Sequence, residues 1–322
     1  MDKLKLSIAC RPYDHVRPLM DKTVRPEGMD LSFICLEPHE TFTRQIRDRE
    51  FDISEMSLSY YTYLHSQGNE NFLAIPIFPA RTFRHSCIYI HTGSGIRKPE
   101  DLRGASIGVP GYYMTAAVWL RGLLQHEFGV KPEDMKWYYS RKDIFDWDPP
   151  GKLDYHKIPE DQNLDDLLQS GKIQALMNVR KPVPFRKGAV TVARLFPDYQ
   201  QAEKDYYAKT GIFPIMHTLV VKREIHEKHP WVAPALYRAF VASREFLASE
   251  LDESGTMEYS LAWFLPALEE ERKLLGKNFW DYGLKNNRKA VETLIQYSHE
   301  QGLASRIMPA EELFIAETLG LD

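Results

Sequence analysis

Short apolar strands alternate with helical segments along the first half of the chain. Residues Leu4–Ala9 form an aliphatic stretch that ends at a polar segment, and residues 31–36 form a second one, followed by a helical pattern over 40–49. Residues 51–57 form another short strand pattern. Strands that alternate with helices are typical of βαβ units, whose strands pair in parallel. The alternation therefore predicts an α/β fold with mostly parallel sheets flanked by helices.

A glycine turn follows the strand expected over residues 105–109. Pro110 and Gly111 break that strand, and residues 114–128 then have apolar side chains at helical spacing. The free N–H groups at the start of a helix, together with the positive end of its dipole, favour a negatively charged ligand. The strand, turn and helix together predict an anion site at the start of this helix.

The rest of the chain contains further strands and, beyond residue 224, mainly helices. Residues 141–162 are rich in Asp, Pro and Lys and are expected to form a long surface loop. The helical stretch 257–275 is expected to be interrupted at Pro266, because proline lacks the N–H that a helix interior needs. The other expected elements are strands at 72–78, 85–91, 175–177 and 214–221 and helices at 164–170, 230–251, 288–301 and 309–319.

The length and charge of the chain exclude several classes of protein. Its 322 residues are 43% hydrophobic, which is enough for a large core. At roughly 150 residues per domain, this length suggests two domains. The 41 Lys and Arg residues are balanced by 45 Asp and Glu residues, so no excess of positive charge is available to neutralise phosphates. We therefore expect no nucleic-acid partner.

The cysteines and the N-terminus indicate the compartment. Cys10, Cys35 and Cys87 form neither a close pair nor a cluster with metal-ligand spacing, which favours a reducing environment. The first apolar stretch is broken by Lys5 and Ser7 and is too short for the core of a signal peptide. No apolar run approaches the ~20 residues of a membrane span. These features predict a cytoplasmic protein with no membrane partner.

Several stretches spread over most of the chain form a recognisable set. They are YDHVRPL at 13–19, residues 84–89 and 92–102, residues 108–121 with MTAA at 114–117, and KTGIFPIMH at 209–217 followed by HPW at 229–231. Together with the order of strands, loops and glycine turn, they resemble the two-lobed type II periplasmic binding protein fold. Within that fold, the chain resembles the 4,5-dihydroxyphthalate decarboxylase family.

The resemblance implies two lobes that are connected by two crossings. The first lobe is expected to contain residues 1–90 and 218–322, and the second residues 91–217. Ligands of such folds bind between the lobes, at strand ends and helix N-termini. An interlobe cleft where Arg84 and His85, residues 112–115 and His217 converge is therefore expected.

Arginines near the ends of the expected strands are candidates for binding a carboxylate, because the planar guanidinium group matches the two carboxylate oxygens. Arg11, Arg17 and Arg84 are expected to bind substrate, and Arg81 lies in the same region. For each of these arginines, the alternative is an ordinary role on the surface or in an ion pair, without contact to the substrate. A dicarboxylate needs two such positions. The other expected substrate-binding residues are His15, Ser57, Tyr112, Met114 and Thr115.

Three residues are candidates for proton transfer. His217 and His85 fall at expected strand ends within the recognised stretches, and histidine exchanges protons near neutral pH. Glu55, at the end of a short strand, is a candidate base for a phenolic proton or a partner for an arginine. A structural, hydrogen-bonded role is the alternative for each histidine. The sequence leaves open which histidine donates a proton.

No cofactor is expected. A divalent metal held by His15, His85, His217 and Glu55 is the alternative, but no His-x-His or His-x-x-x-His spacing supports such a site.

The resemblance implies a carboxy-lyase that decarboxylates 4,5-dihydroxyphthalate to 3,4-dihydroxybenzoate (protocatechuate) and CO₂ in phthalate catabolism. In that substrate a hydroxyl lies para to each carboxylate, so polarising it makes the ring carbon basic enough to accept a proton. A solute-binding protein for a small aromatic or carboxylated anion is one alternative, because fold does not settle function. A related enzyme with another aromatic acid as substrate is a second alternative. The apolar faces of the C-terminal helices predict a homo-oligomer.

Overall fold

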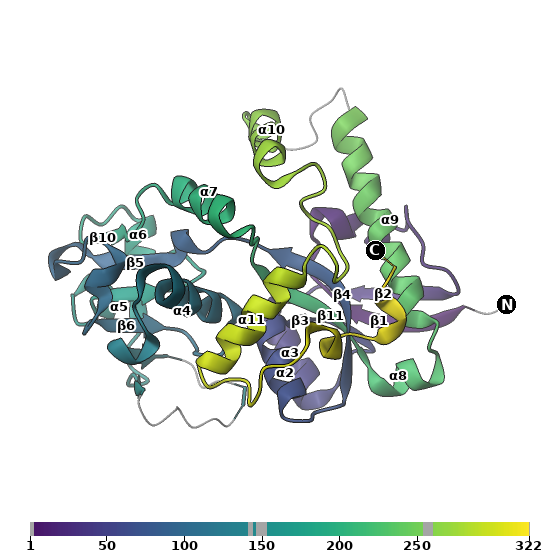
Figure 1. Cartoon of the computed structure of the whole chain (residues 1–322), viewed down its shortest axis with the longest axis horizontal. Helices are drawn as coiled ribbons and strands as arrows, with labels where there is room; N and C mark the ends of the chain where they lie inside the picture. Colours follow the sequence, from purple (N-terminus) through teal and green to yellow (C-terminus); the bar gives the residue numbers. More distant parts are fainter. Residues whose placement is uncertain (1–2, 141–143, 146–152, 254–259, 322) are drawn as a thin grey trace.

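The computed structural model describes residues 3–140, 144–145, 153–253 and 260–321, and it contains two β-sheets flanked by helices (Figure 1). The strands are β1 (Leu4–Ala9), β2 (Met29–Ile34), β3 (Ile53–Ser57), β4 (Phe72–Arg81), β5 (Ile88–His91), β6 (Ser106–Val109), β7 (Lys136–Tyr139), β8 (Asp154–Lys157), β9 (Ala175–Met177), β10 (Val192–Arg194) and β11 (Ile215–Lys222). The α-helices are α1 (Arg17–Met20), α2 (Pro38–Asp48), α3 (Leu58–Ser66), α4 (Thr115–Phe128), α5 (Leu164–Gln169), α6 (Val183–Arg186), α7 (Tyr199–Thr210), α8 (Arg223–Lys228), α9 (Val232–Glu253), α10 (Phe264–Leu275) and α11 (Arg288–Glu300).

The first sheet has the strand order β2-β1-β3-β11-β4. β1 pairs in parallel with β2 and β3, whereas β11 runs antiparallel to β3 and β4 because it enters from the opposite direction. Every residue of β3 is buried. A strand buried in this way is normally apolar throughout, so the buried carboxylate of Glu55 in β3 is unusual and needs polar partners.

The second sheet has the strand order β10-β5-β9-β6-β7-β8. β9, β6, β7 and β8 pair in parallel, and β5 and β10 add an antiparallel edge. The short strand β6 ends at Val109, directly before Pro110, and α4 begins six residues later at Thr115. This is the strand, turn and helix expected from the sequence.

Two chain crossings join the sheets. Residues 82–87 connect β4 to β5, and residues 195–214, which include α7, connect β10 to β11. We call the part built on the first sheet lobe 1 and the part built on the second sheet lobe 2; they lie to the right and left in Figure 1. The expected boundaries at 90/91 and 217/218 fall within β5 and β11, whose sheet membership assigns all of β5 to lobe 2 and all of β11 to lobe 1.

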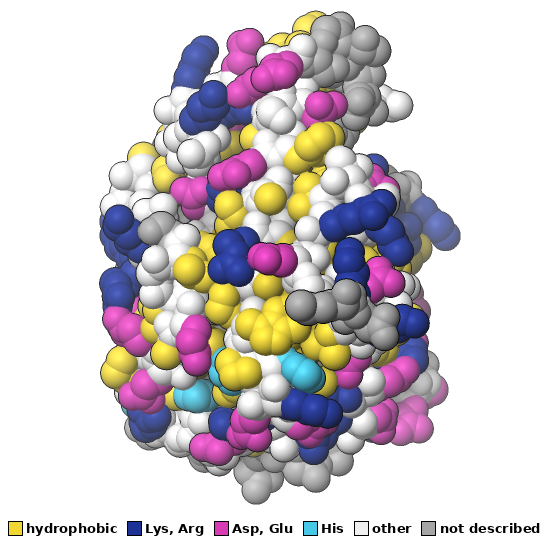
Figure 2. Space-filling model, turned by 90° about the vertical axis from the view of Figure 1, so that its right-hand side faces the viewer, with side chains coloured by type: hydrophobic (Ala, Val, Ile, Leu, Met, Phe, Trp, Pro, Cys, Tyr) yellow, Lys and Arg dark blue, Asp and Glu magenta, His cyan; other side chains and the backbone are white. Residues whose placement is uncertain are grey.

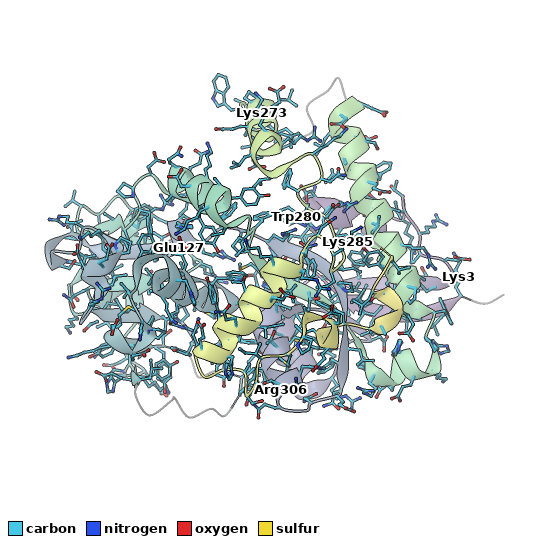
Figure 3. All side chains as sticks on the ribbon, in the orientation of Figure 1. Lys3, Glu127, Lys273, Trp280, Lys285 and Arg306 are labelled. Atoms are coloured by element: carbon cyan, nitrogen blue, oxygen red, sulfur yellow. The ribbon has the colours of Figure 1, made fainter. Side chains whose placement is uncertain are left out.

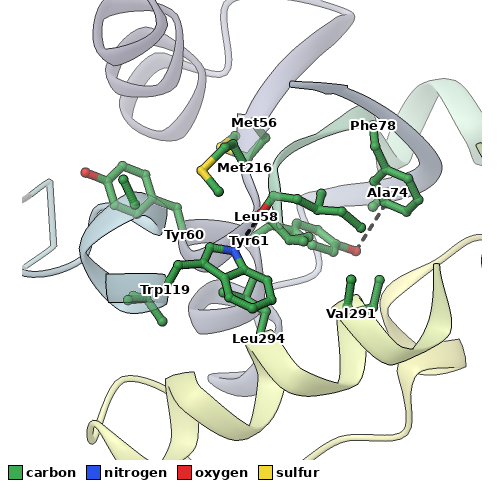
Figure 4. Packing of buried hydrophobic residues seen from close by; sticks show 14 of the residues in the cluster. Met56, Leu58, Tyr60, Tyr61, Ala74, Phe78, Trp119, Met216, Val291 and Leu294 are labelled. Carbon is green, nitrogen blue, oxygen red and sulfur yellow. Dashed lines mark hydrogen bonds between the residues drawn. The ribbon is translucent and has the colours of Figure 1, made fainter. Parts of the chain in front are cut away.

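Apolar side chains from both lobes pack together beside the crossings (Figure 4). The buried indole of Trp119 in α4 donates a hydrogen bond to the backbone oxygen of Ile215 at 2.9 Å. Gly122 leaves room for the ring of Tyr297 in α11, since a Cβ at Gly122 would lie 1.9 Å from that ring. The lobes are therefore held in firm contact by α4 and α11 on one side of the crossings.

Three local expectations were wrong. The helix expected over 309–319 is instead two short 3₁₀ turns, Ala310–Leu313 and Ala316–Thr318. Within the expected loop 141–162, residues Asp154–Lys157 form β8, which pairs with β7 and, among the described residues, stands at the edge of the sheet. Its sequence, DYHK, carries little apolar signal because three of its four residues are exposed. Residues 141–143 and 146–152 lie outside the described residues. Pro266 does not interrupt α10, because it occupies the first turn, where the missing N–H has no intrahelical partner to lose.

The described surface carries charges of both signs. Figure 2 shows Lys and Arg side chains interspersed with Asp and Glu side chains over the described part of one face. Among the described residues, no helix combines the length and the apolar character that crossing a bilayer requires.

Candidate active site

A cleft of about 940 Å³ lies between the lobes. Lobe 1 contributes residues that follow β2 and β3 and the start of β11, and lobe 2 contributes the start of α4, the start of α5 and the segment after β9. Five of the expected site residues line this cleft. They are Ser57, Arg84, Met114, Thr115 and His217.

His217 is brought into the cleft wall by irregular pairing of β11. It lies opposite Ser57 of β3, while the register between β11 and β4 shifts on both sides of it. Such bulges turn a side chain away from the regular alternation of a strand. The imidazole is 16% exposed and packs nearly perpendicular to the Phe42 ring, with the ring centroids 5.0 Å apart. One side of the imidazole is thus next to an apolar group.

Glu55 lies behind His217 and does not line the cleft. Its Oε1 accepts hydrogen bonds from His217 Nδ1 and from the Tyr13 hydroxyl, each at 2.5 Å, and its Oε2 accepts one from the Arg11 backbone N–H at 3.1 Å. Because Nδ1 faces the carboxylate, the proton belongs on Nδ1 and the Nε2 atom is left for the cleft. This is a carboxylate-oriented histidine, an arrangement suited to proton transfer.

The charge state of Glu55 follows from its partners. Burial alone raises the pKa of this carboxyl, but the charge of His217 and the hydrogen bonds from His217, Tyr13 and the Arg11 backbone outweigh it, so the pKa is below its usual value. Burial and the adjacent Glu55 carboxylate raise the pKa of the Tyr13 phenol. Glu55 is therefore ionised and Tyr13 neutral at neutral pH.

The N-termini of α3 and α4 meet at the cleft. Ser57 caps α3 by accepting a hydrogen bond from the Tyr60 backbone N–H, and its hydroxyl lies 2.7 Å from the hydroxyl of Thr115, the first residue of α4. Ser59 Oγ lies 3.0 Å from the same Thr115 hydroxyl. These bonds join the lobes and direct the positive ends of two helix dipoles into one space. The expected anion site at the start of α4 therefore opens onto the cleft.

Arg84 lies on the first crossing and is partly buried. Its Nε–H donates to the sulfur of Met216 at 3.3 Å, and its Nη1 lies 4.0 Å from the sulfur of Cys87. Sulfur is a weak acceptor, and no carboxylate among the described residues forms a salt bridge with Arg84. The guanidinium group is thus available to bind an acidic ligand.

Arg180 is a cleft residue that the sequence analysis missed. It follows β9 in lobe 2, and its Nη2 lies 3.4 Å from Oε2 of Glu37 in lobe 1. Oε1 of Glu37 in turn lies 2.5 Å from Nη1 of Arg11. Arg180 stands in a polar loop with several other charged residues, so its sequence context does not separate it from an ordinary surface arginine. Its position gives the cleft a second cation.

Arg11 and Arg17 do not line the cleft. Arg11 is engaged by Glu37, and its main contribution to the site is the backbone N–H given to Glu55. Arg17 is exposed at the start of α1. Both arginines follow the end of β1 in the sequence. The helical segments after β1 place Arg17 on the exposed surface, outside the cleft.

Three further expected site residues lie in packed regions outside the cleft lining. His15 is buried between Tyr13 and Trp280, and its Nδ1 lies 3.0 Å from Asp14 Oδ1. Tyr112 is 1% exposed and packs on the guanidinium of Arg121. His15 and Tyr112 therefore pack in the interior and do not line the cleft.

His85 is the third of these residues. It is 3% exposed beside Phe196 and Tyr206, and its Nδ1 lies 3.9 Å from Glu203 Oε1. Burial lowers the pKa of His85 to about 4, and burial raises the pKa of Glu203 to about 7. Burial therefore favours the neutral forms of both groups. His85 directly follows Arg84 in the chain, but Arg84 lines the cleft and His85 does not.

The described part of the chain brings no three His, Cys, Asp or Glu side chains together as a metal-binding group. In particular, His15 and His85 lie apart from the pair of His217 and Glu55, so the four residues named for a metal in the sequence analysis are not all neighbours.

Solved structures with the same architecture include periplasmic binding proteins. The aliphatic sulphonate binding protein SsuA of Escherichia coli has a TM-score of 0.55 and 12% identity, covering 97% of this chain and 98% of that one. The alkanesulfonate-binding protein SsuA of Xanthomonas axonopodis has a TM-score of 0.55 and 9% identity, covering 98% and 99%. A Candida albicans protein described with the generic periplasmic binding protein fold has a TM-score of 0.52 and 12% identity, covering 100% and 99%. The predicted two-lobed fold is confirmed.

Two curated proteins are similar in sequence, whereas no family model matches the chain. The 4,5-dihydroxyphthalate decarboxylase of Comamonas testosteroni is 37% identical over 320 residues, covering 98% of this chain and 97% of that protein. The 4,5-dihydroxyphthalate decarboxylase of Pseudomonas putida is 38% identical over 213 residues, covering 64% of this chain and 83% of that protein. The chain therefore belongs to the 4,5-dihydroxyphthalate decarboxylase family.

Proposed function

We propose that this chain is a carboxy-lyase that converts 4,5-dihydroxyphthalate into 3,4-dihydroxybenzoate and CO₂. The observation that carries the proposal is the hydrogen-bonded pair of His217 and Glu55 in the wall of a cleft that also exposes Arg84. This arrangement offers a proton and a carboxylate-binding group in one space. Membership of the family supports the choice of substrate.

The cleft has the chemistry that an aromatic dicarboxylate requires. Its volume lies within the ~300–1,000 Å³ that is usual for small-molecule sites. Arg84 is proposed to bind the carboxylate that the product keeps, because a guanidinium can donate two parallel hydrogen bonds to it. Arg180 and the N-termini of α3 and α4 supply positive potential for the other negative groups of the substrate.

His217 is proposed to be the proton donor. As an imidazolium, it gives Nδ1–H to Glu55 and presents Nε2–H to the substrate. The ring carbon that bears the departing carboxylate takes this proton, with electron density supplied by the para oxygen. The bond to the carboxylate then breaks, its electron pair returns to the ring, and CO₂ leaves. Neutral His217 regains a proton from water, so one proton is consumed for each CO₂ released.

Glu55 is proposed to be a positioning residue, in place of the base considered in the sequence analysis. It does not line the cleft and hydrogen-bonds to His217, which does, so it acts through the imidazole by fixing its tautomer and stabilising its charge. His85 is given no proton-transfer role, because it does not line the cleft and its pKa of about 4 leaves it neutral.

The absence of a required cofactor, a cytoplasmic location and homo-oligomerisation remain predictions from the sequence. The first of these is part of the proposal, since the residues described above carry every step. The alternative of a divalent metal is tested together with the activity.

The test is the turnover of 4,5-dihydroxyphthalate by the purified full chain after treatment with a chelator. We expect equal amounts of CO₂ and 3,4-dihydroxybenzoate. Binding without turnover, even after divalent metal is restored, would contradict the proposal and favour a solute-binding protein. Turnover that appears only on addition of metal would overturn the metal-free mechanism while leaving the reaction in place.

A further inference from the structure

A second, smaller pocket lies on the molecule outside the active-site cleft. Its volume is about 220 Å³, and it is formed where β4 ends, where α7 leads into β11, and where the segment after α10 leads into α11. It therefore lies at both crossings between the lobes. Figure 3 labels Trp280, which lies in this region between α7 and α11, and whose ring packs against that of Phe213 at the pocket wall.

The pocket contains a buried cation. Arg81, the last residue of β4, is 9% exposed. Its Nη1 is 3.3 Å from the backbone oxygen of Phe279 and 3.5 Å from that of Asp281, and its Nη2 is 3.0 Å from that of Phe213, whose ring lies 4.6 Å from the guanidinium carbon. Its Nε–H is buried and has no hydrogen-bond acceptor among the described residues. A guanidinium has five N–H donors, so carbonyl oxygens satisfy this group only in part.

The nearest acidic side chain does not neutralise Arg81. Asp281 lines the same pocket, but its Oδ1 is 2.5 Å from Arg244 and its Oδ2 accepts a hydrogen bond from Asn286 at 3.0 Å. No salt bridge joins Arg81 to a carboxylate in the described ranges of the chain. Burial of this unpaired charge is unfavourable and lowers the pKa of Arg81 to about 10. Among the described residues, the one carboxylate of the pocket lining is thus paired with Arg244 and not with Arg81.

The other walls favour one class of ligand. Lys289 adds a second cation, and its Nζ bonds only to the Thr210 backbone oxygen among the described contacts. Tyr207, Phe213 and Phe279 add aromatic surface. A cavity of about 150 Å³ is enough to hold benzene, so this pocket has room for a ring that carries one carboxylate.

We propose that this pocket is a second binding site, for an aromatic monocarboxylate whose carboxylate pairs with Arg81 and whose ring lies against the aromatic wall. The site is separate from the cleft that holds Arg84 and His217. It does not rest on the proposed reaction, because the recognition chemistry is contained in the pocket itself.

The test uses 4-bromobenzoate with the full chain. Calorimetry measures its affinity for the wild type, for Lys289→Glu, which reverses an exposed charge of the pocket, and for the control Lys273→Glu, which makes the same change on α10 outside the pocket. Anomalous diffraction from bromine locates the ligand in crystals. Bromine in the Arg81 pocket, with affinity reduced at least tenfold by Lys289→Glu and unchanged by Lys273→Glu, is the expected result.

Two results would overturn the second site. One is bromine in the cleft alone, and the other is equal affinity in all three proteins. Arg81→Gln gives a further check where circular dichroism shows that it folds, since it removes the carboxylate partner and should abolish binding in the pocket. Decarboxylation is assayed separately, so a failure of the proposed reaction and a failure of this site are distinguishable.

Discussion

The carboxylate of Glu55 lies 2.5 Å from Nδ1 of His217, although 162 residues separate them in the chain. β3 and β11 are adjacent antiparallel strands, so the chain must pass through lobe 2 and return before the pair forms. The pair therefore depends on the correct assembly of lobe 1 around the returning strand.

Glu55→Gln should reduce kcat with little change in KM. The amide keeps the size of the side chain but removes the negative charge that stabilises the imidazolium, and general acid catalysis contributes about 10²–10⁴-fold to such rates. We expect a loss of kcat of about 10²-fold. Glu50→Gln, an exposed change after α2, is the control, and an unchanged kcat in Glu55→Gln would remove Glu55 from its positioning role.

Arg84→Ala should raise KM more than it lowers kcat. Charge-assisted hydrogen bonds contribute about 1.5–3 kcal/mol, which corresponds to roughly 10-fold to 150-fold in affinity. Arg17→Ala is the matched control, because Arg17 is exposed outside the cleft. Steady-state kinetics of both variants separate the two arginines that the sequence treated alike. Equal KM values for Arg84→Ala and the wild type would mean that Arg84 does not bind the carboxylate.

His85→Phe should make the free energy of unfolding less dependent on pH. Burial lowers the folded-state pKa of His85 from 6.5 to about 4, so the unfolded chain binds this proton first as the pH falls. The wild type should thus lose about 3 kcal/mol between pH 6.5 and pH 4 through this group. Glu203, whose pKa is about 7, is protonated over most of this range and supplies little counter-charge.

Urea unfolding of the wild type and His85→Phe at several pH values measures this difference. His156→Phe, at an exposed histidine of β8, is the control. Parallel stability curves for His85→Phe and the wild type between pH 6.5 and pH 4 would contradict the account of a neutral, buried His85.

The sequence predicted those parts of the fold whose pattern is local. Leu4–Ala9 was predicted to be a strand and is a strand in the structure. The predicted strand, glycine turn and helix around residue 111 are also present in the structure. The strand β8 was missed, because a four-residue strand whose side chains are mostly exposed needs few apolar residues.

The site was predictable only in part, for a related reason. His217 and Glu55 were both named from the sequence, but nothing local indicates that β11 inserts beside β3, so their pairing came only with the structure. Arg17 and Arg180 illustrate the same limit. Both lie in polar segments that follow a predicted strand, so their neighbours in the sequence do not distinguish them. Which of them faces the cleft depends on the orientation of each lobe, not on neighbouring residues.

The central claim is that His217 donates the proton to the substrate ring, and His217→Asn tests it most directly. Turnover and equilibrium binding of 4,5-dihydroxyphthalate are measured on this variant, with His156→Asn as the control. The account predicts a loss of turnover of at least about 10²-fold, with substrate affinity nearly unchanged and the control fully active. Turnover by His217→Asn at a rate close to that of the wild type would contradict the account.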